Sequence, residues 1–163
     1  MTVLVRPAHT SELGEVGALT VTAYTVDGVL AGDDPYVAHL ADAVTRAREA
    51  EVYVAVQPDG DLAGTVTFCP QGSPWCELAQ PGEGEFRMLA VAPAHRNQGV
   101  ARALVGACLE RSRELGYDAV VLCSLPAQTT AHRLYEALEF RRQPELDWSP
   151  HEGVDLWAFR LEL

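Results

Sequence analysis

The segment DAVVLCSL, residues 118–125, constrains the fold of this chain more than any other stretch. It is apolar almost without interruption and is stopped by Pro126. A short continuous apolar run is typical of a strand that is buried on both faces of a sheet, whereas a strand with one solvated face alternates. Helical apolar patterns precede and follow the run, so the chain is expected to fold as a mixed α/β protein.

The other segments add strands and helices in an order that fits one domain over residues 1–163. A composition of 48% hydrophobic and 21% charged residues is globular, and 163 residues suffice to bury a core. The expected order is strand, two helices, three strands, helix, strand, helix and two strands. The expected strands cover residues 3–5, 51–57, 62–68, 85–91, 118–125, 140–142 and 154–163, and the expected helices cover 10–24, 35–48, 100–115 and 128–138.

Charge and cysteine spacing argue against several classes of protein. The net charge is −11, and an acidic chain is a poor candidate for binding nucleic acid, which needs a basic surface. The N-terminus carries Arg6 and lacks a long apolar run, so we expect neither a signal peptide nor a membrane span, and a cytoplasmic location. The chain has four cysteines, Cys69, Cys76, Cys108 and Cys123, and no two of them form a C-x-x-C pair. We therefore expect free thiols and no metal site.

The segment HRNQGVARAL, residues 95–104, follows an expected strand and opens an expected helix. At such a junction, free N–H groups and the helix dipole bind phosphate. Gly99 allows a positive φ and a close approach of the backbone, and Arg96 adds charged donors. The segment is neither G-x-x-x-x-G-K-[ST] nor G-x-G-x-x-G, which argues against nucleotide hydrolysis and dinucleotide binding. Taken alone, it is either a phosphate-binding loop or a plain capped loop.

The flanking residues narrow this choice. The stretch Arg96-Asn-Gln-Gly-Val-Ala101 matches the R/Q-x-x-G-x-G/A signature of the GNAT acetyltransferase superfamily. Residues 85–93, EFRMLAVAP, resemble the strand before this motif, and residues 131–140, AHRLYEALEF, resemble the helix after the next strand. The resemblance runs from about 84 to 142, and residues 1–70 fit only in element order. It implies the GNAT fold, a central, mostly antiparallel sheet that is flanked by helices and splayed apart to admit acetyl-CoA.

The same resemblance implies which residues hold the coenzyme. The amides of the loop would bind the pyrophosphate. The backbone of the preceding strand would hydrogen-bond the pantetheine arm and polarise the thioester carbonyl. The residues implied for the loop are Arg96, Asn97, Gln98, Gly99, Val100, Ala101 and Arg102, and those for the strand are Leu89, Ala90 and Val91. Gln128 stands where the family usually has an asparagine, and its side-chain amide is implied to reach the coenzyme. Glu139 replaces the usual glycine after the last helix. A left-handed non-glycine residue there costs about 1 kcal/mol, so this helix is expected to end differently from the family pattern.

Two side chains are implied for proton transfer. Acetyl transfer requires the neutral amine, so a base must remove its proton. Glu85 stands where some family members carry a glutamate base, with Glu83 as the substitute; alternatively, Glu85 only pairs with Arg87 or a neighbouring strand. Tyr135 stands where the family places a tyrosine general acid near the coenzyme sulfur; alternatively, it is a core tyrosine. His132, one helical turn away, is expected at the surface or beside the coenzyme.

The resemblance therefore implies an acetyl-CoA-dependent N-acetyltransferase that acts on a primary amine by direct transfer in a ternary complex, without a metal. The alternative is a non-catalytic acyl-CoA-binding sensor or partner module of the same fold. The acceptor stays open between small-molecule and protein amines, as does the length of the acyl chain. Asp27, Asp33 and Asp34 either attract a cationic amine or are ordinary loop acids. Many family members dimerise, and the C-terminal strand is an expected edge for a possible homodimer.

Overall fold

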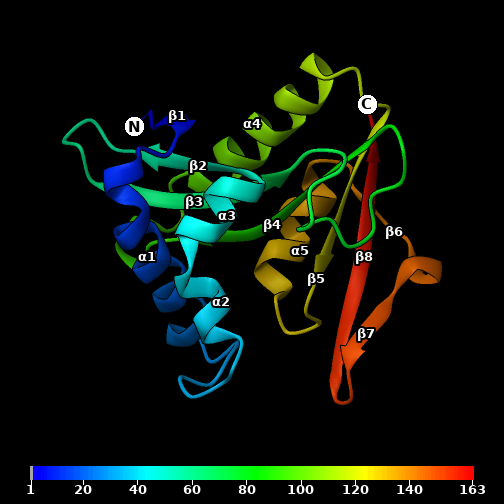
Figure 1. Ribbon diagram of the computed structural model, residues 1–163, viewed down its shortest axis with the longest axis horizontal. Coiled ribbons are helices and arrows are strands. Elements are labelled where there is room, and N and C mark those ends of the chain that lie inside the picture. The colour runs from blue at the N-terminus through cyan, green and yellow to red at the C-terminus, as the bar shows by residue number, and fades with distance from the viewer. Residues whose placement is uncertain (1) are drawn as a thin grey trace.

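The computed structural model describes residues 2–163 and contains one eight-stranded sheet (Figure 1). Its strands follow the order β1-β2-β3-β4-β5-β8-β6, and β7 pairs with β8 off this path. All neighbouring strands are antiparallel except β4 and β5, which are parallel. The bounds are β1 (Leu4–Pro7), β2 (Glu51–Val56), β3 (Leu62–Cys69), β4 (Glu83–Val91), β5 (Ala119–Ser124), β6 (Arg141–Arg142), β7 (Trp148–His151) and β8 (Val154–Glu162). The predicted mixed α/β fold with a mostly antiparallel sheet is confirmed.

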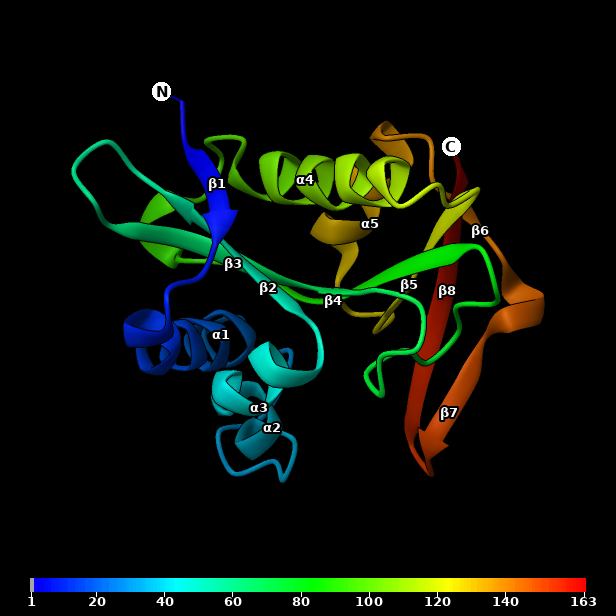
Figure 2. The ribbon, with the colours of Figure 1, turned by 45° about the horizontal axis from the view of Figure 1, so that its top comes forward.

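Two layers of helices cover the sheet. The helices are α1 (Leu13–Val26), α2 (Val37–Ala41), α3 (Ala43–Glu49), α4 (Val100–Glu114) and α5 (Thr129–Ala137). Figure 2 shows α1, α2 and α3 on one face and α4 and α5 on the other. The first layer buries Leu13 and Val16 against Val54, and the second buries Leu104 against Val66. Every residue from Ala119 to Leu122 of β5 is buried, which confirms the strand predicted from the apolar run.

The second predicted helix, residues 35–48, is wrong as a single element. It is divided into α2 and α3 at Asp42, whose φ of −87° and ψ of 68° leave the helical region. The Asp42 carboxylate accepts hydrogen bonds from the backbone N–H and the hydroxyl of Thr45 at 3.1 and 2.6 Å. Aspartate is a strong N-cap residue, so this local bonding starts a new helix at the expense of the old one.

The C-terminal strand is not the free edge that the sequence predicted. On the side away from β5, Arg160 and Phe159 of β8 pair with β6, and Leu156 pairs with Trp148 of β7. The sequence did not reveal β7, because its residues WSPH are polar and contain Pro150, which argues against a strand.

The sheet opens between β4 and β5. The two strands pair only at residues 83–85 of β4 and 119–121 of β5. Beyond this point β4 carries a bulge, because Met88 and Leu89 stand together opposite Val66 of β3, and Met88 has a φ of +54°. A bulge bends its strand and increases the local twist. The remaining part of β4 therefore diverges from β5, and the predicted splay is present.

The end of α5 has a left-handed conformation, so the expectation that Glu139 changes how this helix ends is wrong. Glu139 has a φ of +72°, and Phe140 donates its amide to the carbonyl of Tyr135 at 2.9 Å. This is the bond that closes a helix through a left-handed residue, and glycine is preferred there because it lacks a Cβ. Glu139 is exposed, so its side chain brings no packing to offset this cost.

Replacing Glu139 by glycine should raise the free energy of unfolding by about 1 kcal/mol, because glycine adopts a positive φ without steric strain. Thermal unfolding should show a Tm roughly 2–4 °C higher. Glu136→Gly is the matched control, since this exposed residue lies within α5, where glycine costs about 1 kcal/mol relative to good helix formers. Equal Tm values for the two variants would contradict the strain at Glu139.

Candidate functional site

The N-terminus of α4 presents free backbone N–H groups. Gly99 caps the helix with a φ of +79°, and no side chain caps it. Ala103 is the first residue whose amide bonds backward, to the carbonyl of Gly99 at 3.0 Å. Within residues 2–163, the amides of Val100, Ala101 and Arg102 have no hydrogen-bond acceptor. Amides in this arrangement, together with the helix dipole, make an anion-binding site.

The loop before α4 is held from two sides. Asn97 has a φ of +60°, so two of three successive residues are left-handed and the loop is tightly turned. From the end of β2, the amide nitrogen of Gln57 lies 3.3 Å from both a ring nitrogen of His95 and the side-chain oxygen of Gln98. Arg96 forms an ion pair with Asp27 at the end of α1. The loop is therefore fixed by residues distant in sequence, and Gln57 gave no signal because it ends an ordinary strand pattern.

A glycine lets α4 lie close to the sheet. At Gly64 of β3, an added Cβ would come within 2.8 Å of the Ala90 carbonyl oxygen and 2.9 Å of a Val100 methyl group. Such contacts are too short for real atoms, so the position requires glycine. The first turn of α4 is thus packed directly over β3 and β4, next to the end of β4.

Beyond Glu85, the side of β4 that faces β5 is unpaired. Ala90 pairs with Thr65 of β3, and the amide of Ala92 bonds the carbonyl of Ala63 at 2.8 Å. Backbone groups alternate between the two sides of a strand, so Leu89 and Val91 turn their N–H and C=O groups toward the opening. This open edge ends at the loop that leads into α4.

The opening between β4 and β5 is a cleft that brings together several of the predicted site residues. The cleft is lined by Tyr24, Phe86, Arg87, Met88, Leu89, Cys123, Gln128, Ala131 and Tyr135. Leu89, Gln128 and Tyr135 were predicted as site residues. Cys123 is half-buried on the cleft wall, and all four cysteines are free thiols, as expected.

Tyr135 belongs both to the core and to the cleft. Its ring packs against Phe86, Phe140 and Phe159 at centroid distances of 5.9, 5.8 and 5.6 Å. No hydrogen bond within residues 2–163 engages its hydroxyl, although the residue lines the cleft. Burial raises the pKa of this phenol well above its usual value, so the hydroxyl keeps its proton and can donate a hydrogen bond.

Gln128 holds the turn between β5 and α5. Its side-chain oxygen accepts hydrogen bonds from the amide of Leu125 at 2.9 Å and from the hydroxyl of Ser124 at 3.0 Å. Ser124 also lies 3.0 Å from a ring nitrogen of His132. His132 is buried and stacks on Trp157 at 5.6 Å, so the expected surface position is wrong, while a position beside the coenzyme stays a prediction.

Glu85 is fully buried, and its carboxylate anchors the loop between β3 and β4. One oxygen accepts hydrogen bonds from the amides of Glu77, Leu78 and Ala79 at 3.0, 2.9 and 3.0 Å. Burial raises the pKa of Glu85, although these amides oppose the rise. It does not line the cleft. Glu83 pairs with Arg160 at 2.9 Å.

Arg87 is a site residue that the sequence did not assign. It lines the cleft one residue before the bulge, and it makes an ion pair with Glu77 at 3.3 Å. It also donates to the hydroxyl of Tyr36 at 3.0 Å and to the carbonyl of Trp75 at 3.2 Å. Its expected pairing with Glu85 is absent among the ion pairs of residues 2–163. Burial raises the pKa of Glu77, and the charge of Arg87 opposes this rise.

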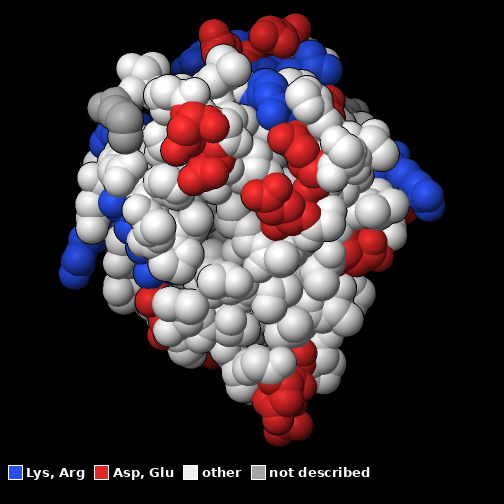
Figure 3. Space-filling model, turned by 90° about the vertical axis from the view of Figure 1, so that its left-hand side faces the viewer, with Lys and Arg blue, Asp and Glu red and all other residues white. Residues whose placement is uncertain are grey.

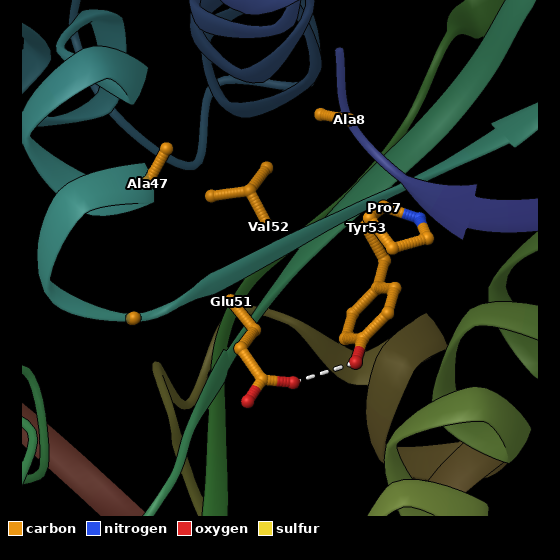
Figure 4. A pocket seen from close by; sticks show the side chains of 7 residues that line it. Pro7, Ala8, Ala47, Glu51, Val52 and Tyr53 are labelled. Atoms are coloured by element: carbon orange, nitrogen blue, oxygen red, sulfur yellow. Dashed lines mark hydrogen bonds between the residues drawn. The ribbon is translucent and has the colours of Figure 1, made fainter. Parts of the chain in front are cut away.

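A second hollow, of about 280 Å³, lies between α3, β2 and the end of β1 (Figure 4). Its only carboxylate, Glu51, accepts a hydrogen bond from the Tyr53 hydroxyl at 2.7 Å and pairs with Arg111 at 2.9 Å. Its polar side chains are therefore already engaged, and it has none of the free donors found at α4.

The three aspartates that could attract a cationic amine have other roles or lie exposed. Asp27 pairs with Arg96, Asp34 accepts a hydrogen bond from the amide of Tyr36 at 2.8 Å, and Asp33 is exposed. Figure 3 shows acidic side chains distributed over one face of the molecule, with arginines mostly at its margins. Among the described residues, no three His, Cys, Asp or Glu side chains are grouped so that they could hold a metal.

The fold and site define a class of protein with a splayed sheet and an anion-binding helix N-terminus. Residues 21–140 match the model of the acetyltransferase (GNAT) family. The chain belongs to this family.

Relatives and solved structures agree with this assignment. A mouse protein described as probable N-acetyltransferase family 8 member 5 is 44% identical over 87 residues, which cover 51% of this chain and 35% of that protein. A GNAT-family acetyltransferase from Staphylococcus aureus Mu50 has a TM-score of 0.76 at 14% identity, with 99% of both chains covered. The Salmonella typhimurium protein yncA, a putative acetyltransferase solved with acetyl-CoA, has a TM-score of 0.68 at 19% identity, with 100% of this chain and 95% of that one covered.

The chain spans about a third of the length of several curated relatives that it matches. Within residues 2–163, no helix is long and apolar enough to cross a membrane.

Proposed function

We propose that the protein is an acetyl-CoA-dependent N-acetyltransferase that transfers the acetyl group directly to a primary amine. The observation that carries this proposal is the set of free N–H groups at the start of α4, which lies where the open edge of β4 ends. An anion-binding turn joined to an unpaired strand edge suits a ligand that has a diphosphate and an extended, amide-containing arm. A homodimer and a cytoplasmic location remain predictions from the sequence.

The residues of this chain fit acetyl-CoA. The amides of the loop and the first turn of α4, with Arg96 and Arg102 nearby, would hold the diphosphate. An added Cβ at Gly99 meets no atom within 4 Å, so the space in front of these amides is open. Leu89 and Val91 would hydrogen-bond the arm through their backbone, and Gln128 would contact it through its amide nitrogen. When bound, acetyl-CoA supplies the activated acetyl thioester.

Tyr135 is proposed to donate a hydrogen bond or a proton at the sulfur of the departing thiolate. Its hydroxyl has no partner in the described chain, faces the cleft, and stays protonated because burial raises its pKa. In the overall exchange, a C–N bond forms as the C–S bond breaks, one proton leaves the nitrogen, and the sulfur gains one.

Glu85 is proposed to accept the proton of the amine, through water, because its carboxylate does not itself reach the cleft. A raised pKa makes a buried carboxylate a stronger base than an exposed one. Glu77 is the nearest competitor for this role, since it pairs with Arg87 on the cleft wall and its pKa is also raised by burial.

Calorimetric titration with acetyl-CoA, followed by a thiol-release assay on a panel of amines, tests the function directly. Gly99→Glu should weaken binding by about 100-fold or more, because a carboxylate would stand against the diphosphate and the backbone would be strained. Gly116→Glu is the matched control at the other end of α4, with a φ of +75° and open space around it. Unchanged binding by the Gly99 variant would refute the assignment of the loop.

Tyr135→Phe should lower kcat by about 10²–10⁴-fold, because the donor at the sulfur is lost, while affinity for acetyl-CoA is retained. Steady-state kinetics and titration on the same preparation separate the two effects. Tyr117→Phe serves as the control, because it removes the hydroxyl of a tyrosine outside the cleft, one that accepts a hydrogen bond from the amide of Gln71 at 2.8 Å. A Tyr135 variant with the full rate would leave this residue a purely structural role.

If Glu85 is the base, the rate should rise with pH through its pKa, since only the ionised carboxylate accepts a proton. Burial places this rise above the ordinary glutamate value of about 4.3. Glu85→Gln should remove the acidic limb of the pH profile and lower kcat/KM by about 10²–10⁴-fold. Glu77→Gln and Glu83→Gln should retain the limb. If only the Glu77 variant loses the acidic limb of the pH profile, Glu77 and not Glu85 is the base.

A further inference from the structure

The cleft wall carries one charged side chain and it is positive. Among the described residues that line the cleft, only Arg87 has a side chain that is charged at neutral pH. It lies beside the bulge of β4, next to the backbone groups proposed to hold the thioester. An acceptor that enters the cleft therefore meets Arg87 first among charged groups.

Arg87 forms an ion pair with the carboxylate of Glu77. Glu77 is 3.3 Å from the Arg87 Nε, and the side chains are only 16% and 19% exposed. The position of Glu77 is fixed, because its own amide donates to both oxygens of Glu85 at 3.0 and 3.1 Å. A buried pair of opposite charges costs desolvation energy unless both ends are well bonded.

A second arginine is buried without a carboxylate partner. Arg46 of α3 is 1% exposed, and its Nη1 donates to the carbonyls of His39 and Leu40 at 2.6 and 2.9 Å. Its Nε is buried and has no partner, and no acidic group of the described chain lies within ion-pair distance of it. Burial lowers the pKa of Arg46, the charge of Asp42 opposes this fall, and that of Arg87 adds to it. Within residues 2–163, Arg46 is thus a buried cation with an unpartnered Nε and no ion-pair partner, a situation that favours an added negative charge nearby.

We propose that the acceptor is an α-amino acid, whose carboxylate binds Arg87 and whose ammonium group binds Glu77. A zwitterion carries both charges on neighbouring atoms and can replace the internal ion pair by two external ones. An amine without a carboxylate separates Glu77 from Arg87 and leaves the arginine unmatched. This inference rests on the proposed transferase function, and it names the substrate class of that site.

The test is a comparison of matched acceptors. Thiol release is measured with L-phenylalanine, L-phenylalaninamide and phenethylamine, and with the corresponding leucine and glutamate series. The amino acid should exceed its amide and its decarboxylated amine in kcat/KM by about tenfold or more, as expected for a buried hydrogen bond between charged groups. Comparable values for all three members of every series would overturn the proposal.

The variants locate the preference. Arg87→Gln should lower kcat/KM for the amino acid by about 10²-fold and change that for the amine much less, so that the preference for the amino acid is lost. Arg87→Lys should recover only part of the loss, because lysine lacks the planar fork. Arg48→Gln is the matched control, since this arginine is exposed on α3 beside Arg46. An equal loss on all acceptors would mean that Arg87 only supports the fold.

A binding measurement separates this inference from the transferase proposal. The same compounds are titrated calorimetrically into the protein saturated with coenzyme A, which permits no turnover. Tighter binding of the amino acid, lost in Arg87→Gln, supports the substrate class even if no acetyl transfer is found; in that case only the transferase proposal fails. Equal or undetectable binding of acid and amide overturns the substrate class, whatever the rate of transfer.

Discussion

The separation of β4 from β5 after Glu85 is the constraint on which the rest of the site depends. Three residues of each strand pair, and then the bulge at Met88 bends β4 away. Continuous pairing would have closed the cleft and used the backbone groups of Leu89 and Val91. Because the strands diverge, Tyr135 keeps a free hydroxyl facing the gap, and the open edge of β4 ends at the free amides of α4.

The polar groups on the two sides of the cleft serve different purposes. On the side of α4 and α5, they are backbone N–H groups and hydroxyls, held by Gly64, Gln57 and Gln128. On the side of β4, the cleft presents the charge of Arg87, and Glu85 anchors the amides of residues 77–79 and thereby places Glu77 against Arg87. The first arrangement suits a ligand that is bound through its phosphate and amide groups. The second suits a ligand that carries a charge of its own.

Much of the fold and part of the site could be predicted from the sequence, because both depend on local signals. The apolar run of β5 and the positive φ of Gly99 are local signals of this kind. The left-handed conformation of Glu139 was not expected, because the local preference for glycine argued against it. The ion-pair cluster around Arg87 could not be predicted, because its contact with Tyr36 spans 51 positions along the chain. Gln57 was missed for the same reason, since it reaches Gln98 across 41 positions. The break at Asp42 was missed although its signal, an aspartate three residues before Thr45, was local.

The half-buried thiol of Cys123 bears on the kinetic route. It stands on the cleft wall, where it accepts a hydrogen bond from the Trp148 indole at 3.4 Å, and burial raises its pKa to about 12. The thiolate is the nucleophilic form of cysteine, so a raised pKa leaves this thiol protonated at neutral pH. A covalent acyl-enzyme at this cysteine is therefore disfavoured. An unreactive thiol on the cleft wall is consistent with the proposed direct transfer, in which the amine itself attacks the thioester.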